Sequence, residues 1–397
     1  MRTAIIGGGA AGFFLAVNLK EMVPSMAVTI LERSQHVLAK VEVSGGGRCN
    51  CTNSFAHVTD LSQVYPRGHR LLKRLFKVFD YRAGYQWFES HGVRLVTQDD
   101  DCVFPALQDS HAIINCFLSE AKRHQIEIRM GAKVNALDDV ADYDFVAVCI
   151  GGSPQASGLQ WLADAGHEIV KPVPSLFTLS IADRQLTELM GTVVEPVQVM
   201  IPGTKFRADG PLLITHWGVS GPAVLRVSSY GARHLSEADY QVPLSINWTG
   251  CKEPEVLEQL QSIVAQQPQK QLQTVAPCGL PARLWSYLLT KTLGERSKNR
   301  WQNLNQKELN RLVNTLTNDV YMTAGRAAFR DEFVTCGGVS LADVNPATLE
   351  SRHVPNLYFA GEVLDIDGIT GGFNFQAAWT TAYVVATAIK MKAENGN

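Results

Sequence analysis

The first 32 residues constrain the fold of this chain more than any other segment. A short apolar run at residues 3–6 leads directly into the spacing Gly7-x-Gly9-x-x-Gly12. Gly7 permits a tight turn, Gly9 lets the backbone approach a pyrophosphate, and Gly12 lets a helix pack closely on the strand. The small-residue segment 10–20 predicts that helix, with its positive amino end facing the phosphates.

The next apolar run continues the same pattern. Residues 28–31 read as a second strand that ends at Glu32. A carboxylate at this point accepts hydrogen bonds from a ribose diol and repels a 2′-phosphate. The alternative is a glycine-rich turn that binds no ligand. That alternative does not explain why a second strand and a terminal Glu follow at the spacing of a dinucleotide-binding unit. We therefore predict a βαβ unit that binds a dinucleotide.

Composition limits the class of protein. The chain has 397 residues, which predicts two or three domains, and 46% hydrophobic with 19% charged residues is typical of a globular protein. The net charge of −2 excludes polyanion binding by bulk charge, although local basic patches remain open. We find no signal peptide and no apolar run of transmembrane length, so we expect a cytoplasmic protein without a membrane partner.

The eight cysteines are scattered along the chain. Cys49-x-Cys51 is the only close pair, and no His or Cys stands at the spacing that a metal site needs. We therefore expect reduced thiols and no metal, with a redox disulfide between these two residues as the alternative.

The pattern of elements changes twice along the chain. The first third alternates between helices at 71–79, 81–91 and 111–124 and strands at 126–129, 134–137 and 145–150, the last ending in Gly151-Gly152. Short β segments follow at 176–181, 193–201, 211–215 and 242–248, then a helical pattern from about 254 to 318. A strand at 357–360 and a helix at 373–392 return to α/β character.

This order predicts an interrupted domain. We expect a Rossmann-like α/β domain that binds FAD, made of residues 1–178 and 335–397. Residues 179–334 would form an inserted β-barrel domain that carries the helical excursion.

The segment 40–53 is the most distinctive part of the sequence. It contains Gly45-Gly46-Gly47, and three consecutive glycines make sense where backbone amides press against a ligand. Lys40 and Arg48 supply positive charge for a phosphate or an electron-rich ring, and Asn50 offers both a donor and an acceptor. The alternative is a flexible surface loop.

A second glycine-rich segment follows the strand at 357–360. Glu362 could hydrogen-bond a ribityl chain, and Gly371-Gly372 leads into a helix that starts near Phe373 and Asn374. A helix amino terminus there would stabilise the negative charge of a reduced flavin. We expect the two glycine-rich segments, residues 44–50 and 361–374, to lie close together around one cofactor.

The β-rich region contains one well-placed titratable group, His216. Histidine can exchange a proton at neutral pH, which suits general acid–base work. A purely structural histidine is the alternative.

Two stretches combine cations with apolar or aromatic residues. In residues 67–77, Arg70, Lys73, Arg74 and Lys77 stand at helical spacing on one face. Residues 283–301 mix five cations with Trp285, Tyr287 and Trp301. Such interleaving suits single-stranded or looped RNA, and solvated helix faces are the alternative.

The motifs together resemble the BaiN/RdsA family of NAD(P)/FAD-dependent oxidoreductases, the YhiN-like flavoproteins. The resemblance runs across nearly the whole chain and rests on Gly7-x-Gly9-x-x-Gly12, the run from Lys40 to Asn50, Thr215 to Ala223, Thr335-Cys-Gly-Gly338, and Gly361 to Gln376. It implies a two-part flavoprotein. Family members are associated with the reduction of uridine in 23S ribosomal RNA, the reduction of steroid enones, and the oxidation of small amines.

The favoured hypothesis is an FAD-dependent reductase that passes a hydride from NAD(P)H through flavin N5 to an activated C=C bond. The only dinucleotide fingerprint is assigned to FAD, so NAD(P)H would bind transiently. An enone reductase, an amine oxidase and a non-catalytic RNA-binding flavoprotein stay as alternatives. We assign catalysis to His216, Arg48 and Cys49. The cofactor residues are Gly7, Gly9, Ala10, Ala11, Gly12, Glu32, Arg33, Lys40, Ser44, Gly45, Gly46, Gly47, Arg48, Asn50, Gly151, Gly152, Gly361, Glu362, Gly371, Gly372, Phe373 and Asn374.

Overall fold

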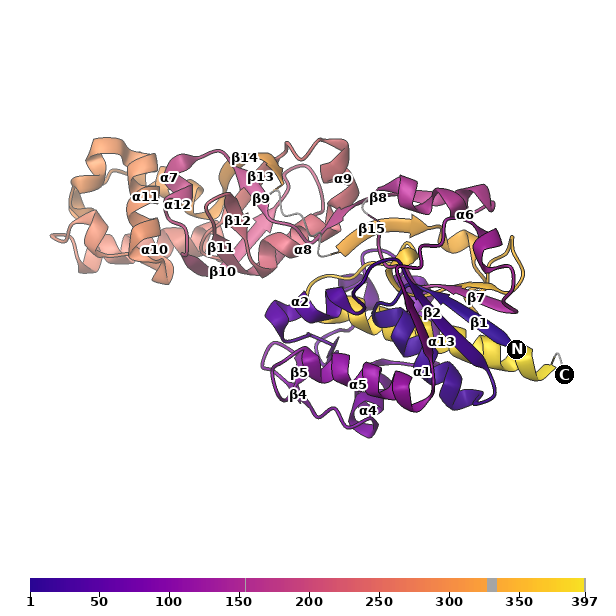
Figure 1. Cartoon of the computed structure of the whole chain (residues 1–397). Helices are drawn as coiled ribbons and strands as arrows, with labels where there is room; N and C mark the ends of the chain where they lie inside the picture. Colours follow the sequence, from indigo (N-terminus) through magenta and orange to yellow (C-terminus); the bar gives the residue numbers. More distant parts are fainter. Residues whose placement is uncertain (154, 327–333, 396–397) are drawn as a thin grey trace. The chain divides into compact units, whose positions relative to one another are not determined.

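A computed structural model describes residues 1–153, 155–326 and 334–395. The chain divides into two compact units (Figure 1). Unit 1 joins both ends of the chain, Met1–Pro174 and Val334–Asn397, and unit 2 is the inserted segment Ser175–Phe333.

Unit 1 is built on a five-stranded parallel sheet. Its order β16-β7-β1-β2-β6 places the strand from the C-terminal region next to strands from the N-terminal region. Central strands of this kind are buried on both faces, which explains their continuous apolar runs. The strands are β1 (Arg2–Ile6), β2 (Ala27–Glu32), β6 (Glu127–Met130), β7 (Phe145–Val148) and β16 (Leu357–Phe359).

Helices and two small sheets complete unit 1. Helix α1 packs against α13 and α5, and the small residues on α1 and α13 allow the close approach. The helices are α1 (Ala10–Met22), α2 (Ala39–Gly47), α3 (His69–Leu75), α4 (Tyr81–Ser90), α5 (His111–Arg123), α6 (Gln160–Asp164) and α13 (Phe373–Asn395). The small sheets are β3 (Thr52–Asn53) with β5 (Cys102–Pro105) and β4 (Leu95–Thr97), and β15 (Val334–Val339) with β8 (Ile169–Ser175).

Unit 2 contains a closed barrel of short antiparallel strands, in the order β10-β11-β12-β9-β14-β13. Closure leaves no free edge for another chain to pair with. The strands are β9 (Leu179–Ile181), β10 (Val193–Met200), β11 (Arg207–Ile214), β12 (Gly218–Ser220), β13 (Pro243–Asn247) and β14 (Asp319–Arg326).

A helical excursion leaves the barrel after β13 and returns at β14. Trp248, Trp285 and Trp301 are fully buried in the core that the barrel and excursion share. The helices of unit 2 are α7 (Arg184–Thr187), α8 (Pro222–Tyr230), α9 (Ala232–Glu237), α10 (Glu253–Gln266), α11 (Ala282–Leu293) and α12 (Gln306–Thr317).

The predicted fold class, a Rossmann-like α/β domain with an inserted β-barrel and a helical excursion, is confirmed. The strand predicted at residues 134–137 is wrong. The Asp139 carboxylate accepts hydrogen bonds from the N–H groups of Asn135 and Ala136, which turns the chain into a 3-10 turn at Leu137–Val140. Among the described residues, no helix combines the length and apolar character needed to cross a membrane.

Candidate functional site

The glycine fingerprint forms a turn at the carboxyl end of β1. Gly7 has φ of 112°, and a Cβ there would lie 2.4 Å from the Cys149 carbonyl oxygen. A Cβ on Gly12 would lie 2.0 Å from the Gly7 carbonyl oxygen, so helix and turn touch through backbone alone. A Cβ on Gly9 would meet nothing within 4 Å, so the start of α1 is open on that side.

The amino end of α1 lacks a side-chain cap. Its first turn, which starts with Ala10 and the buried Ala11, carries no acidic residue. An uncapped helix start beside an open glycine is a favourable place for a phosphate.

Glu32 lies at the carboxyl end of β2, beside the fingerprint. Its carboxylate accepts the N–H of Gly8 and the N–H of Ser34, both at 2.8 Å. A carboxylate offers about four lone-pair sites, so two remain for a ribose diol. Arg33, which follows, is exposed.

Glu362 joins three chain segments at the same edge of the sheet. It accepts the N–H of Thr335 at 2.7 Å and pairs with the Lys40 ammonium at 2.9 Å. A Cβ on Gly152 would lie 2.7 Å from Glu362 Oε1, and one on Gly151 would lie 3.9 Å from Oε2. Lys40, Gly151, Gly152 and Glu362 therefore come together, as expected for residues that follow neighbouring parallel strands.

Residues 44–48 bend the end of α2. Ser44, Gly45 and Gly46 leave helical geometry, and Gly45, Gly46 and Gly47 all have positive φ. A Cβ on Gly46 or Gly47 would meet nothing within 4 Å. The Arg48 guanidinium lies 4.3 Å from the centre of the Phe104 ring and donates to the Gly45 carbonyl, so it is held beside this open backbone.

Cys49 is fully buried, and burial raises the pKa of its thiol to about 12. Burial likewise holds the pKa of the Cys51 thiol well above its usual range, and both cysteines are free thiols. The thiolate is the reactive form of cysteine, so this burial disfavours a reactive thiol at Cys49, and its catalytic assignment stays a prediction.

The two glycine-rich segments, predicted to lie close together, are in contact. Asn53 donates to the Gly371 carbonyl at 3.0 Å, and a Cβ on Gly372 would lie 2.1 Å from the Thr52 carbonyl oxygen. The Asn50 amide, with its nitrogen towards the Thr52 carbonyl, accepts the N–H of Gly372 at 3.3 Å. Only glycine fits here, because Gly372 combines φ of 87° with this close approach.

The start of α13 is held firmly behind these contacts. Asn374 exchanges two hydrogen bonds with Gly368, and the Phe373 carbonyl accepts the Tyr65 hydroxyl at 2.8 Å. A buried ion pair between Arg67 and Asp367 anchors the same loop. Asp367 lies within the glycine-rich segment 361–374, but no sequence pattern indicates Arg67 as its partner.

These residues fit an FAD molecule. The open backbone at Gly9, Gly46 and Gly47 supplies amides without side chains in the way, and Glu32 retains lone pairs for a ribose. The first βαβ unit would hold the adenosine and pyrophosphate part of FAD. Residues 44–53 and 371–376, which contact each other, would hold the flavin part.

His216 belongs to unit 2 and not to this group of residues. It lies in the turn between β11 and β12, is exposed, and has its ring 4.6 Å from the ring of the exposed Trp217. It is therefore available to a ligand from solution.

The basic face predicted in residues 67–77 is exposed on α3 and the turn that follows. Arg70, Lys73, Arg74 and Lys77 are exposed, while Leu71, Leu72 and Leu75 are buried on the other side. Within the described ranges, none of these four side chains makes a hydrogen bond or an ion pair. Lys73 does lie near an acid: the hydrogen bonds from Ser62 and, to a smaller extent, the charge of Lys73 lower the pKa of Asp60.

The second predicted RNA stretch is different. Trp285 and Trp301 are fully buried and stacked with their ring centres 6.2 Å apart, and Tyr287 is 8% exposed. These three aromatics are core residues and offer no exposed ring to RNA, so RNA contact by this stretch would depend on its cations alone. The cations of the stretch have partners within the unit: Arg283 with the Glu188 carbonyl, Lys291 with Asp319, Arg296 with Glu308, Lys298 with Glu295, and Arg300 with Gln269.

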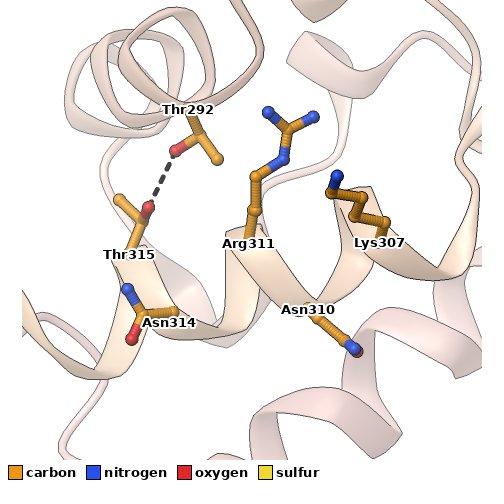
Figure 2. A pocket seen from close by; sticks show the side chains of 6 residues that line it. All are labelled: Thr292, Lys307, Asn310, Arg311, Asn314 and Thr315. Carbon is orange, nitrogen blue, oxygen red and sulfur yellow. Dashed lines mark hydrogen bonds between the residues drawn. The ribbon is translucent and has the colours of Figure 1, made fainter.

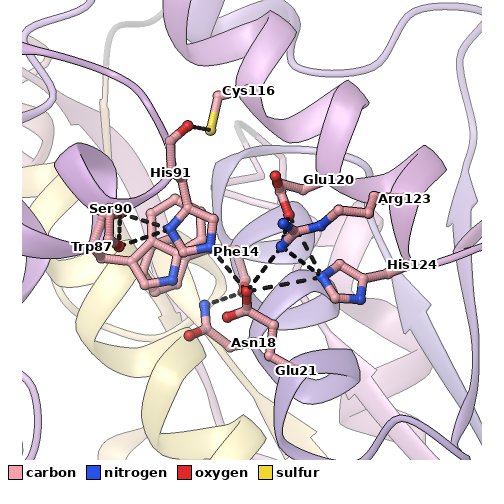
Figure 3. Close-up of polar contacts among 10 residues, drawn as sticks. All are labelled: Phe14, Asn18, Glu21, Trp87, Ser90, His91, Cys116, Glu120, Arg123 and His124. Carbon is pink, nitrogen blue, oxygen red and sulfur yellow. Dashed lines mark hydrogen bonds and ion pairs between the residues drawn. The ribbon is translucent and has the colours of Figure 1, made fainter.

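An ion-pair cluster links α1, α4 and α5 (Figure 3). Ligand atoms of Glu21, His91 and Glu120 lie within 4.8 Å of one another. The Arg123 guanidinium stands among them, 2.5 Å from Glu120 and 3.4 Å from Glu21. Arg123 thus supplies positive charge where a metal ion would, and the cluster is explained as a tie between helices.

Comparison with known proteins gives relatives along the full length of the chain. It is 26% identical to the 3-dehydro-bile acid delta(4,6)-reductase of Clostridium scindens, over 98% of each chain. It is 27% and 28% identical to the ribosomal RNA dihydrouridine synthases of Haemophilus influenzae and Escherichia coli, over 97% and 96% of each chain.

A family model described as "HI0933-like protein Rossmann domain" matches residues 1–388. This range includes the fingerprint at β1, the segment around α2, the whole inserted unit and the start of α13. The chain therefore belongs to the family of HI0933-like proteins with a Rossmann domain.

Proposed function

We propose that this FAD-dependent oxidoreductase uses NAD(P)H to reduce a uridine C=C bond in ribosomal RNA, in the cytoplasm. FAD, when bound, supplies a flavin ring that accepts and donates a hydride. The full-length relatives named as ribosomal RNA dihydrouridine synthases support the substrate class. The observation that carries the proposal for this chain is the row of unpaired cations on α3.

The chain's own residues bind and orient the cofactor. The amides at the start of α1 would receive the pyrophosphate, and Glu32 would accept the ribose hydroxyls. Glu362 is held in place by Thr335 and Lys40, so it can orient a group at the carboxyl edge of the sheet. Arg48 would contribute positive charge next to an electron-rich ring.

Reduction of a C=C bond adds a hydride to one carbon and a proton to the other. His216 is our candidate proton donor, because its imidazole is exposed in the turn between β11 and β12 and imidazole is a common general acid. Cys49 is not assigned to this step, since its thiol is buried and keeps its proton.

The RNA would contact the cations of α3. Four exposed cations on one face attract a phosphate backbone, and the free energy of binding depends on salt because counterions are released. Contacts to phosphate position an RNA without reading its sequence. The choice of a particular uridine must then come from other parts of the protein.

Mass spectrometry of ribosomal RNA tests the proposal. RNA from cells that lack the protein is incubated with the purified FAD-loaded chain and either NADH or NADPH. We expect one uridine to gain the mass of two hydrogen atoms, and no gain without the nicotinamide. Absence of any mass change with both donors would refute the proposed reaction.

A small-molecule enone reductase is the second candidate. The observation in its favour is the full-length similarity to the bile acid reductase of C. scindens. Consumption of NAD(P)H with a steroid enone, but not with ribosomal RNA, would establish it instead.

A further inference from the structure

Helices α11 and α12 form a polar groove on the helical excursion of unit 2. Its volume is about 630 Å³, and Figure 2 shows its lining, with the Lys307 and Arg311 side chains directed to the same side of α12. The lining residues are Thr292, Lys307, Asn310, Arg311, Asn314 and Thr315.

The groove is basic. Lys307 and Arg311 are four residues apart on α12, so they lie about 6 Å apart along the helix axis. No carboxylate lines the groove. Glu308 on this helix does not line the groove, but its carboxylate, 3% exposed, pairs with Arg296 at 2.5 Å and with Arg311 at 4.0 Å. Arg311 is therefore partly compensated, and Lys307 has no ion pair among the described residues.

The remaining lining residues are amides and hydroxyls. Asn314 is exposed, and Thr292 and Thr315 are bonded to each other at 3.0 Å (Figure 2). Such groups exchange hydrogen bonds with ribose hydroxyls and phosphate oxygens. No aromatic or apolar side chain lines the groove, so the Arg311 guanidinium is the one planar group in its lining.

The groove is built on a stable helix. Asn305 and Glu308 form a capping box at the start of α12, and Leu309, Leu312 and Leu316 bury its other side. Lys307 and Arg311 project away from this buried side, so substitutions there do not disturb the core.

We propose that this groove binds the sugar–phosphate backbone of single-stranded or looped RNA. The inference rests on the proposed function, and it replaces the stretch 283–301 as the RNA-contacting surface of unit 2. The groove would add affinity and position without base selectivity, because its cations and amides match the backbone alone.

The test compares two double variants with the same loss of charge. K307Q/R311Q removes both cations of the groove, and K298Q/R300Q removes two exposed cations of unit 2 that do not line it. Binding of a fluorescent single-stranded RNA fragment of ribosomal RNA is measured by anisotropy at several salt concentrations. Flavin absorbance and thermal unfolding report whether each variant is folded and loaded.

We expect K307Q/R311Q to raise Kd about tenfold and to reduce the slope of log K against log salt by about 1.4, which corresponds to two phosphate contacts on a single strand. K298Q/R300Q should change Kd less than about twofold. Equal Kd for K307Q/R311Q and the wild type, with RNA still bound, would refute the groove and leave the proposed function standing. A wild-type chain that binds no RNA would refute both.

Discussion

Residues 67–77 and 283–301 each carry five Lys or Arg residues, but only the first stretch presents a row of them without partners. The four exposed cations of the first stretch make no side-chain ion pair among the described residues, and Leu71, Leu72 and Leu75 are buried on the other side. In the second stretch each cation meets an acid or a carbonyl oxygen, and the interleaved aromatics are core. The comparison teaches that a basic sequence indicates an RNA surface only where folding leaves its charge uncompensated.

Removal of a core aromatic should give the largest effect. W301A deletes an indole that is fully buried and stacked on Trp285, and we expect it to lower the free energy of unfolding by about 3–5 kcal/mol. The RNA affinity of the molecules that remain folded should not change. Chemical denaturation and RNA anisotropy on the same sample measure the two quantities.

A different outcome would reverse the comparison. If W301A leaves unfolding unchanged and weakens RNA binding, then the aromatics of 283–301 contact RNA after all. W301F is the matched variant, because it keeps the ring and removes an indole N–H that has no partner in the described structure.

Charge reversal on α3 should give the next largest effect. K73E/R74E places two acids in the exposed row, and we expect RNA binding to weaken at least about tenfold at moderate salt. FAD content and thermal stability should stay at the wild-type values, because neither side chain packs against the core. Anisotropy and flavin absorbance measure these effects.

The control for this variant makes the same change of charge at compensated sites. Lys390 and Lys392 on α13 pair with Glu394 and Glu350, so K390E/K392E should affect stability more than RNA affinity. Equal loss of RNA affinity in both variants would mean that net charge, and not the α3 face, governs binding.

The sequence predicted those parts of the site that local spacing determines. The interval between Gly7, Gly9 and Gly12 encodes a turn and a helix start, and both lie where the pattern places them. The strands, the barrel and the excursion followed from periodicity and from the positions of Gly and Pro. Periodicity could not show whether Trp285 is buried or exposed, because aromatic residues recur at the same helical spacing on the buried face and on the exposed face of an amphipathic helix.

Contacts between distant residues lay beyond the sequence analysis. Asn53 meets Gly371 and Thr335 meets Glu362 only because the two ends of the chain share one sheet. The hydrogen bond from the Trp379 indole to the Cys51 carbonyl likewise joins residues far apart in the chain. A single sequence contains no signal for such pairs.

A smaller loss of stability is expected when Arg296, a cation of the second stretch, is separated from the buried acid Glu308. R296Q removes the partner of Glu308, whose side chain is 3% exposed. We expect the free energy of unfolding to fall by about 1–2 kcal/mol. The loss is limited because Arg296 is half exposed, so water can hydrate the Glu308 carboxylate after the substitution. RNA affinity should not change. R296Q/E308Q, which removes the unpaired charge as well, should recover part of the loss in a denaturation experiment, and no recovery would contradict this account of the pair.

The smallest change in stability is expected in the ion-pair cluster that links α1, α4 and α5. A substitution there tests whether paired cations affect stability without affecting RNA binding. Burial lowers the pKa of His91, but its hydrogen bonds to Glu21 and to the Trp87 carbonyl raise that pKa more, so the net shift is upward from 6.5. The hydrogen bond from His91 lowers the pKa of Glu21 below 4.5 despite its partial burial.

The sign of the pH dependence follows from these two shifts. A raised histidine pKa stabilises the fold below pH 6.5, and this contribution disappears as the pH rises through the folded-state pKa. A lowered carboxyl pKa stabilises the fold above pH 4.5 and is lost as the pH falls. H91Q should therefore lower the free energy of unfolding by about 1 kcal/mol or less, mainly between these two pH values, and by almost nothing at pH about 8.

Thermal unfolding of the wild type and H91Q across this pH range measures the difference in stability, while the RNA affinity measured by anisotropy should stay unchanged. A stability loss that does not vary with pH would mean that His91 acts through packing on Trp87 and not through its charge.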